Sequence, residues 1–323
     1  MKHLNIVATC TDRKRGDISE SLRLREIPTG AADVRARSWW HRLDKAPPLE
    51  RVQASCVYVG ENWRLVQALA VQVQKAGWSV DVWITSAGYG LLSRETPITP
   101  YSCTFADTSE DQVARGQPAG QRLQYNREWW SALTGLRAKQ EAAPTSLAAL
   151  AERNPTATLL MLASPDYVRA THADLASAVE RLRCPEQLSI ITSGSGWCGD
   201  LLEDYILSID ERTRSALGGT MQGLHARAAL NLLQSSALGE PFTAAELRAR
   251  YEAMVAETPR PEKPSRTPMT DEEVAAFLRA ELAQQPKAGW TLLLRTLRKS
   301  GRACEQRRFR RLHAETVAVL AGG

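Results

Sequence analysis

Four short apolar runs that each end in a polar loop limit the fold of this chain more than any other feature. The runs span residues 4–9, 80–84, 158–163 and 188–192, and amphipathic helices are expected at 61–75 and 172–183. Apolar runs that alternate with helices are typical of α/β proteins. We therefore expect a mostly parallel sheet flanked by helices, with a ligand crevice at the carboxyl ends of its strands.

The carboxyl-terminal part of the chain differs from the rest in charge. Nine Lys or Arg residues and one acid, Glu305, lie between Lys287 and His313, so this stretch carries +8 while the whole chain carries +5. A basic end on a mildly acidic body is typical of an appendage that binds polyanions, although a solvated helix face is the alternative. We expect an α/β domain over 1–240 and a basic, helix-turn-helix-like helical domain over 241–323. The four prolines between 258 and 268 indicate a linker.

Bulk properties exclude several classes of protein. Hydrophobic residues make up 43% and charged residues 24% of the chain, which is ordinary for a globular protein. The chain contains no run of 18 apolar residues, and the charges at Asp12 and Arg13 follow the first apolar run too early for a signal peptide. We therefore expect a cytoplasmic protein with no membrane partner. The six scattered cysteines are expected to be reduced, without a metal site, and Cys10 is the best placed for a catalytic thiol.

The loop after the second apolar run combines small side chains, two glycines and one aromatic ring. Glycine lets the main chain approach a ligand closely, and a tyrosine can stack on a nucleobase. The candidate substrate-binding residues of this region are Ser86, Gly88, Tyr89 and Tyr101. The alternative for the tyrosines is a place in the core with their hydroxyl groups hydrogen-bonded.

The other strand ends and one helix supply the remaining candidates. Thr11, Ser164 and Ser193 are candidate substrate-binding residues, together with Arg13. A carboxylate among cations stays ionised and can orient a water or stabilise a cationic transition state. The candidate catalytic residues are Asp12, Asp166 and His225. The alternatives are a turn aspartate at Asp12 and a structural helix histidine at His225.

Several well-known catalytic patterns are missing from the sequence. It has no Walker A motif, no G-x-G-x-x-G after the first apolar run and no G-x-S-x-G around a serine. Kinase, dinucleotide and serine-hydrolase chemistry are therefore disfavoured, and we expect no cofactor. Cleavage or exchange of a glycosidic bond needs only a carboxylate and hydrogen-bond donors, so this chemistry remains open.

The basic stretch predicts two helices broken at Ser300-Gly301. Trp290, Leu293, Leu294 and Leu297 share one face of the first helix, and the cations leave from another. This pattern favours a helix-turn-helix that lies on phosphates and reads base edges. The candidate DNA-binding residues are Arg295, Arg298, Lys299, Arg302, Gln306, Arg307 and Arg308.

The loops at 9–14 and 86–92 resemble those of a prokaryotic family that joins Thr-Cys-Thr-x-Arg-Lys to Ser-Ala-x-Tyr-Gly-Leu-Leu. The family is related to domains of modified-nucleobase metabolism, and the architecture is similar to that of antiphage DNA glycosylases acting on glucosylated hydroxymethylcytosine. The resemblance implies an enzyme that flips a modified base out of phage DNA and excises it, leaving an abasic site. The alternatives are a transglycosylase or nucleoside-processing enzyme of modified-base metabolism and a non-enzymatic DNA-binding regulator.

Overall fold

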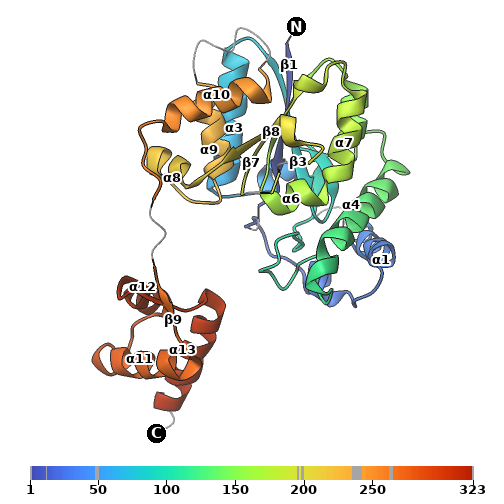
Figure 1. Ribbon diagram of the computed structural model, residues 1–323. Coiled ribbons are helices and arrows are strands. Elements are labelled where there is room, and N and C mark those ends of the chain that lie inside the picture. The colour runs from blue at the N-terminus through green and yellow to red at the C-terminus, as the bar shows by residue number, and fades with distance from the viewer. Residues whose placement is uncertain are drawn as a thin grey trace. The chain divides into compact units, whose positions relative to one another are not determined.

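The chain forms two compact units, Met1–Arg260 and Pro261–Gly323 (Figure 1). The computed structural model describes residues 2–11, 13–47, 51–194, 196–197, 200–234, 242–261 and 265–321. The expected domain boundary after residue 240 is corrected to Arg260, because α10 (Ala244–Val255) belongs to the first unit. In α10, Arg248 donates a hydrogen bond to the carbonyl of Ile206 at 2.9 Å, and Tyr251 donates one to Asp210 at 2.9 Å.

A six-stranded sheet forms the centre of the first unit. Its strands, in spatial order, are β4 (Gly90–Ser93), β3 (Ser79–Ser86), β1 (His3–Thr9), β6 (Thr158–Leu162), β7 (Leu188–Ser193) and β8 (Ile206–Ile209). All neighbouring pairs are parallel except β3 and β4. The prediction of a mostly parallel α/β sheet is confirmed. The five parallel strands have the doubly wound order 2-1-3-4-5, which changes direction between β1 and β6.

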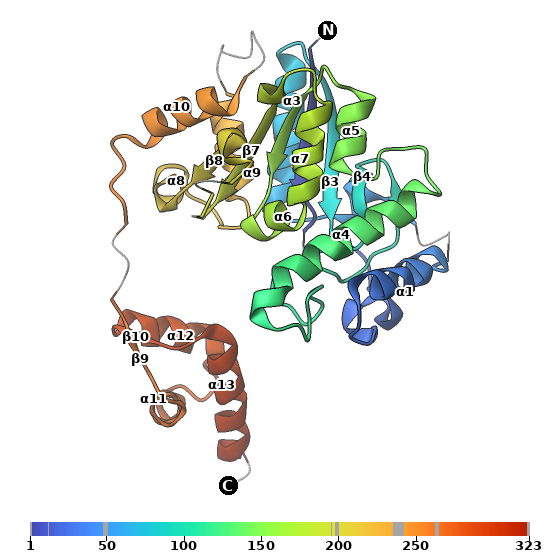
Figure 2. The same cartoon turned by 45° about the vertical axis from the view of Figure 1, so that its right-hand side comes forward.

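Helices cover both faces of the sheet (Figures 1 and 2). One face carries α3 (Glu61–Lys75) and α9 (Leu224–Leu232). The other carries α4 (Arg122–Ala138), α5 (Leu147–Arg153), α6 (Pro165–Ala170) and α7 (His172–Arg181), with α1 (Ala32–Asp44) packed on α4. Smaller elements are α2 (Ala54–Val57), α8 (Glu211–Leu217) and the antiparallel pair β2 (Val52–Gln53) and β5 (Pro97–Ile98). Because both faces are covered, all five residues of β6 are buried.

The helix α3 begins and ends where its sequence pattern predicts. Its buried residues are Trp63, Val66, Leu69, Ala70 and Val73. This three-or-four spacing places one apolar stripe on the sheet. The helix ends before Gly77, whose φ of +87° lies in the left-handed region that favours glycine. The carboxyl end of α3 therefore follows from its sequence.

The second unit contains three helices and a short parallel strand pair. The elements are β9 (Thr267–Pro268), α11 (Asp271–Gln284), α12 (Trp290–Lys299), β10 (Arg302–Ala303) and α13 (Gln306–Ala321). Its core is separate from that of the first unit and includes Val274, Leu278, Leu293, Leu297 and Phe309. Across the described ranges of both units, none of the helices is long and apolar enough to cross a membrane.

Candidate functional site

A pocket of about 370 Å³ opens at the carboxyl ends of β1, β6 and β7. This volume lies within the range of small-molecule sites. The pocket also lies where the strand order changes direction, which is the usual ligand position in open α/β sheets. Its lining residues are Thr9, Cys10, Thr11, Arg13, Val59, Gly60, Glu61, Asn62, Cys103, Thr104, Ala106, Ser164, Tyr167, Ser193, Met221, Gln222 and His225.

The loop after β1 is held against this pocket by hydrogen bonds. The backbone N–H of Cys10 donates to the carbonyl of Thr85 at 3.0 Å, and that of Val59 donates to the carbonyl of Arg13 at 3.3 Å. The Thr11 hydroxyl also donates to Arg13, at 2.7 Å. Thr11 and Arg13 both line the pocket, and their role in substrate binding stays a prediction. Asp12, which lies between them, is outside the described residues.

A thiol and a buried phenol lie side by side in the pocket. The Cys10 Sγ and the Tyr167 hydroxyl oxygen are 3.1 Å apart, which is hydrogen-bonding distance. Burial, followed by the proximity of Cys10, raises the pKa of Tyr167 well above its usual value. Tyr167 is therefore a neutral hydrogen-bonding group at physiological pH.

His225 lines the pocket from the first turn of α9. Its Nε2 atom is buried and has no hydrogen-bond partner among the described residues. Burial disfavours the imidazolium and lowers the pKa of His225 to about 4. The ring is thus neutral at pH 7, and Nε2 can donate or accept one hydrogen bond, depending on its tautomer.

The predicted loop after β3 is a buried hairpin turn rather than a pocket wall, which corrects the assignment of Ser86 and Gly88 to substrate binding. The strand turns back at Ser86 and pairs with β4. The Ser86 Oγ accepts hydrogen bonds from the N–H groups of Gly88 at 3.1 Å and Tyr89 at 2.9 Å. The indole groups of Trp39 and Trp129 bind the carbonyls of Gly88 and Ala87 at 2.8 and 2.7 Å. The polar groups of this turn are therefore occupied within the protein.

Tyr89 and Tyr101 are core residues, so their prediction as substrate contacts is also corrected. Tyr89 is 6% exposed and Tyr101 is fully buried. Their rings pack edge to face with centroids 5.1 Å apart. The Tyr101 hydroxyl bonds to Ser86 and to Tyr58, the latter at 2.9 Å. Because both rings are buried in the core, they are not open to a nucleobase.

Asp166 does not line the pocket, which removes it as a catalytic candidate. It lies on the exposed side of α6, in the first turn. Loss of hydration, followed by repulsion from Asp107, raises the pKa of Asp166, while Arg169 lowers it. Tyr167, the next residue along α6, is the one that points to the pocket.

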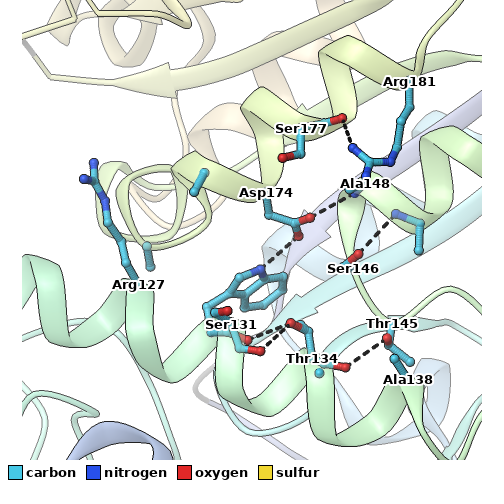
Figure 3. A pocket seen from close by; sticks show the side chains of 15 residues that line it. Arg127, Ser131, Thr134, Ala138, Thr145, Ser146, Ala148, Asp174, Ser177 and Arg181 are labelled. Atoms are coloured by element: carbon cyan, nitrogen blue, oxygen red, sulfur yellow. Dashed lines mark hydrogen bonds between the residues drawn. The ribbon is translucent and has the colours of Figure 1, made fainter.

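In a second hollow between α4, α5 and α7, the Asp174 carboxylate and the Arg181 guanidinium are already hydrogen-bonded within the protein (Figure 3). The Asp174 carboxylate accepts hydrogen bonds from the N–H groups of Leu147 and Ala148 at 2.8 and 2.9 Å, and from the Trp130 indole at 2.9 Å. The Arg181 guanidinium donates to the Ser177 carbonyl at 2.8 Å. Asp174 therefore fastens α5 to α7, and the pocket with the unpartnered His225 is the better candidate site.

The predicted DNA-contacting residues of the second unit fall into two groups. The side chains of Arg295, Lys299, Arg302, Gln306 and Arg307 are exposed and make no ion pair or hydrogen bond within the described ranges. Arg308 differs, because it binds the Asp271 carboxylate and donates to the Met269 carbonyl at 2.9 Å. Arg298 donates to the Cys304 carbonyl at 3.3 Å. The prediction of Arg308 as a DNA contact is corrected to a structural role that joins α13 to the start of α11.

The sequence reasoning missed the amino end of α3 and the segment around Thr104. Gly60, Glu61 and Asn62 line the pocket where α3 begins. Gly60, directly before the helix, was the sequence feature that could have indicated this end of α3. Its φ is +113°. Thr104 and Gln222 carried no pattern that distinguished them from surface residues. Within the described ranges, no three His, Cys, Asp or Glu side chains are grouped to hold a metal ion.

Comparison with known proteins leaves the family open. No protein-family model matches the chain. Searches of curated proteins and of solved structures also returned no match.

Proposed function

We propose that this protein hydrolyses the N-glycosidic bond of a modified base in DNA and leaves an abasic site. The observation that supports the proposal is the pocket at the strand ends, where Thr11, Arg13, Ser164, Ser193 and His225 meet. A pocket with several neutral donors and acceptors suits a flipped nucleoside, which such enzymes read through hydrogen bonds.

The reaction assigns a task to each part of the pocket. The bond between C1′ and the base nitrogen breaks, its electron pair leaves with the base, and a water oxygen bonds to C1′ while its proton passes to the base. Asp12, between two residues of the pocket wall, is the proposed carboxylate that orients the water and stabilises the positive charge on the sugar. The neutral His225 and the serines are proposed to bind the base or sugar.

The second unit is proposed to hold the DNA duplex as a helix-turn-helix-like module. α12 and α13 are joined by a short turn that includes β10, and the exposed side chains of Arg295, Lys299, Arg302 and Arg307 form no ion pair within the described ranges. Such side chains are suited to phosphate contacts. Phage DNA as the target, antiphage defence as the role and the cytoplasm as the location remain predictions from the sequence.

The test is incubation of the full-length protein with a panel of DNAs that carry different base modifications, including glucosylated hydroxymethylcytosine. Alkali treatment then reveals abasic sites, and mass spectrometry identifies the released base. We expect base release that Asp12→Asn abolishes and Asp166→Asn leaves intact, since Asp166 lies outside the pocket. Intact DNA across the panel would contradict the proposal, and base exchange without a free base would favour the transglycosylase instead.

A further inference from the structure

The amino end of α3 is an uncapped helix terminus that opens into the pocket. No side chain caps this helix of 15 residues. Within the described chain, the backbone N–H groups of Glu61, Asn62 and Trp63 have no acceptor. Such N–H groups carry the positive end of the helix dipole and bind anions.

The first turn of α3 carries a carboxylate, Glu61, whose charge is compensated by other groups. Glu61 accepts hydrogen bonds from the N–H of Thr220 at 3.2 Å and from its hydroxyl, and pairs with Arg227. The Thr220 hydroxyl contact is the main cause of the lowered pKa of Glu61, and the Arg227 contact adds to it. Glu61 is therefore ionised but compensated, which leaves the positive end of α3 available to a ligand.

Two further donors reach the same pocket from other elements. Arg13 lines it from the loop after β1 and forms no ion pair within the described residues. His225 lines it from α9, and its buried Nε2 has no partner there. A buried polar atom without a partner is costly, so its presence in a pocket wall points to a ligand that completes the bond.

We infer that the N–H groups at the start of α3, Arg13 and the Nε2–H of His225 form a subsite for the phosphate group of a nucleotide. A phosphate offers several acceptor oxygens, so it can bind a helix terminus, a guanidinium and an imidazole together. The rest of the pocket then receives the sugar and the base. The inference deepens the proposed function, on which it rests for the choice of a nucleotide, and its test measures binding rather than base release.

The test uses ligands without a base, because the base is unknown. Isothermal titration calorimetry compares 2-deoxyribose 5-phosphate with 2-deoxyribose on the full-length protein. We expect the phosphate to improve the dissociation constant by at least about 10-fold, as charge-assisted hydrogen bonds do. Equal binding of the two sugars, or binding of neither, would overturn the subsite.

Matched variants separate the subsite from general charge effects. Arg13→Gln and His225→Leu should each remove most of the preference for the phosphate, whereas His225→Gln, which retains an N–H donor, should keep more of it than His225→Leu. Arg15→Gln is the control, since Arg15 is exposed in the same loop and does not line the pocket. Equal effects of Arg13→Gln and Arg15→Gln would overturn the assignment. Circular dichroism checks that each variant is folded. Inorganic phosphate should compete with the sugar phosphate in the wild-type protein and in Arg15→Gln, and much less in Arg13→Gln and His225→Leu.

A competition experiment identifies whether the phosphate belongs to a DNA strand or to a free nucleotide. A trinucleotide with a central abasic analogue and no terminal phosphate carries only phosphodiesters. Competition by this trinucleotide supports recognition of a DNA strand, and competition by the 5-phosphate alone supports recognition of a free nucleotide. If the protein binds the phosphate but releases no base, the subsite is supported and the glycosylase proposal is contradicted. If it releases a base but shows no preference for the phosphate, the glycosylase proposal is supported and the subsite is contradicted.

Discussion

The Cys10 thiol lies 3.1 Å from the hydroxyl oxygen of Tyr167, and this contact joins the end of β1 to the start of α6 across the change in strand order. Both residues line the candidate pocket. The thiol is therefore a probe already placed at the site, and it can report whether a ligand is bound.

We expect ligand to protect Cys10 from alkylation by iodoacetamide. At a ligand concentration ten times the dissociation constant, labelling of Cys10 should slow by about 10-fold, because only the free pocket reacts. Cys56 and Cys184 are exposed outside the pocket and serve as internal controls. Peptide mass mapping measures all three rates. Unchanged labelling of Cys10 at saturating ligand would show that the ligand binds elsewhere.

His225 should make the free energy of unfolding depend on pH in the acidic range. Its pKa is about 4 in the folded protein and about 6.5 in the unfolded chain. Between these two pH values the unfolded chain binds a proton at His225 and the folded chain does not. The contribution of His225 to the free energy of unfolding is therefore fully present above pH 6.5 and is lost as the pH falls to 4. The loss is on the order of 3 kcal/mol. Urea unfolding of wild type and His225→Gln across this range measures it, and parallel pH profiles would contradict the prediction.

Gly88→Ala should destabilise the first unit. A Cβ at this position would lie 2.6 Å from Cδ2 of the buried Tyr101 ring, so the turn or the ring must shift. The expected loss in the free energy of unfolding is about 1–3 kcal/mol, as for other overpacked cores. Gly135→Ala, in α4 with open space at its Cβ position, should instead gain about 0.5–1 kcal/mol. If Gly88→Ala had the same free energy of unfolding as the wild type, the turn would not be tightly packed.

Arg307→Ala and Arg308→Ala should have different effects, although the residues are neighbours. Arg307→Ala should weaken DNA binding and reduce the salt slope of binding by about 0.9 per lost phosphate contact, with no change in thermal stability. Arg308→Ala should lower the unfolding temperature of the second unit, because it removes the pairing with Asp271 and Met269. Fluorescence anisotropy over a salt series and calorimetry measure the two effects. Equal unfolding temperatures of wild type and Arg308→Ala would contradict the structural role.

The sequence was sufficient to predict the sheet and much of the pocket, because these follow from local patterns. Apolar runs with polar ends predicted β1, β6 and β7, and the residues at those ends line the pocket. The same rule failed after β3, where the chain returns as antiparallel β4. A serine- and glycine-containing loop suits both a ligand crevice and a tight turn, and only the packing of Trp39 and Trp129 above it distinguishes them.

The domain boundary and the role of Arg308 depended on contacts between distant residues. The prolines between 258 and 268 marked the linker, but the helix before them gave no local sign that it packs on β8. Arg308 lies in a basic run and differs from Arg307 only because Asp271, far back in the chain, lies beside it. Charge patterns identify a basic surface, but they do not distinguish a free cation from a paired one.

The pocket is built from six separate stretches of chain, at residues 9–13, 59–62, 103–106, 164–167, 193 and 221–225. No short fragment contains it, and the loops that bring its walls together close only when the first unit folds. Contacts of such long sequence separation form slowly during folding. The capacity to bind ligand should consequently appear late in refolding and in one step, and occupancy of the pocket should delay the unfolding of the first unit as a whole.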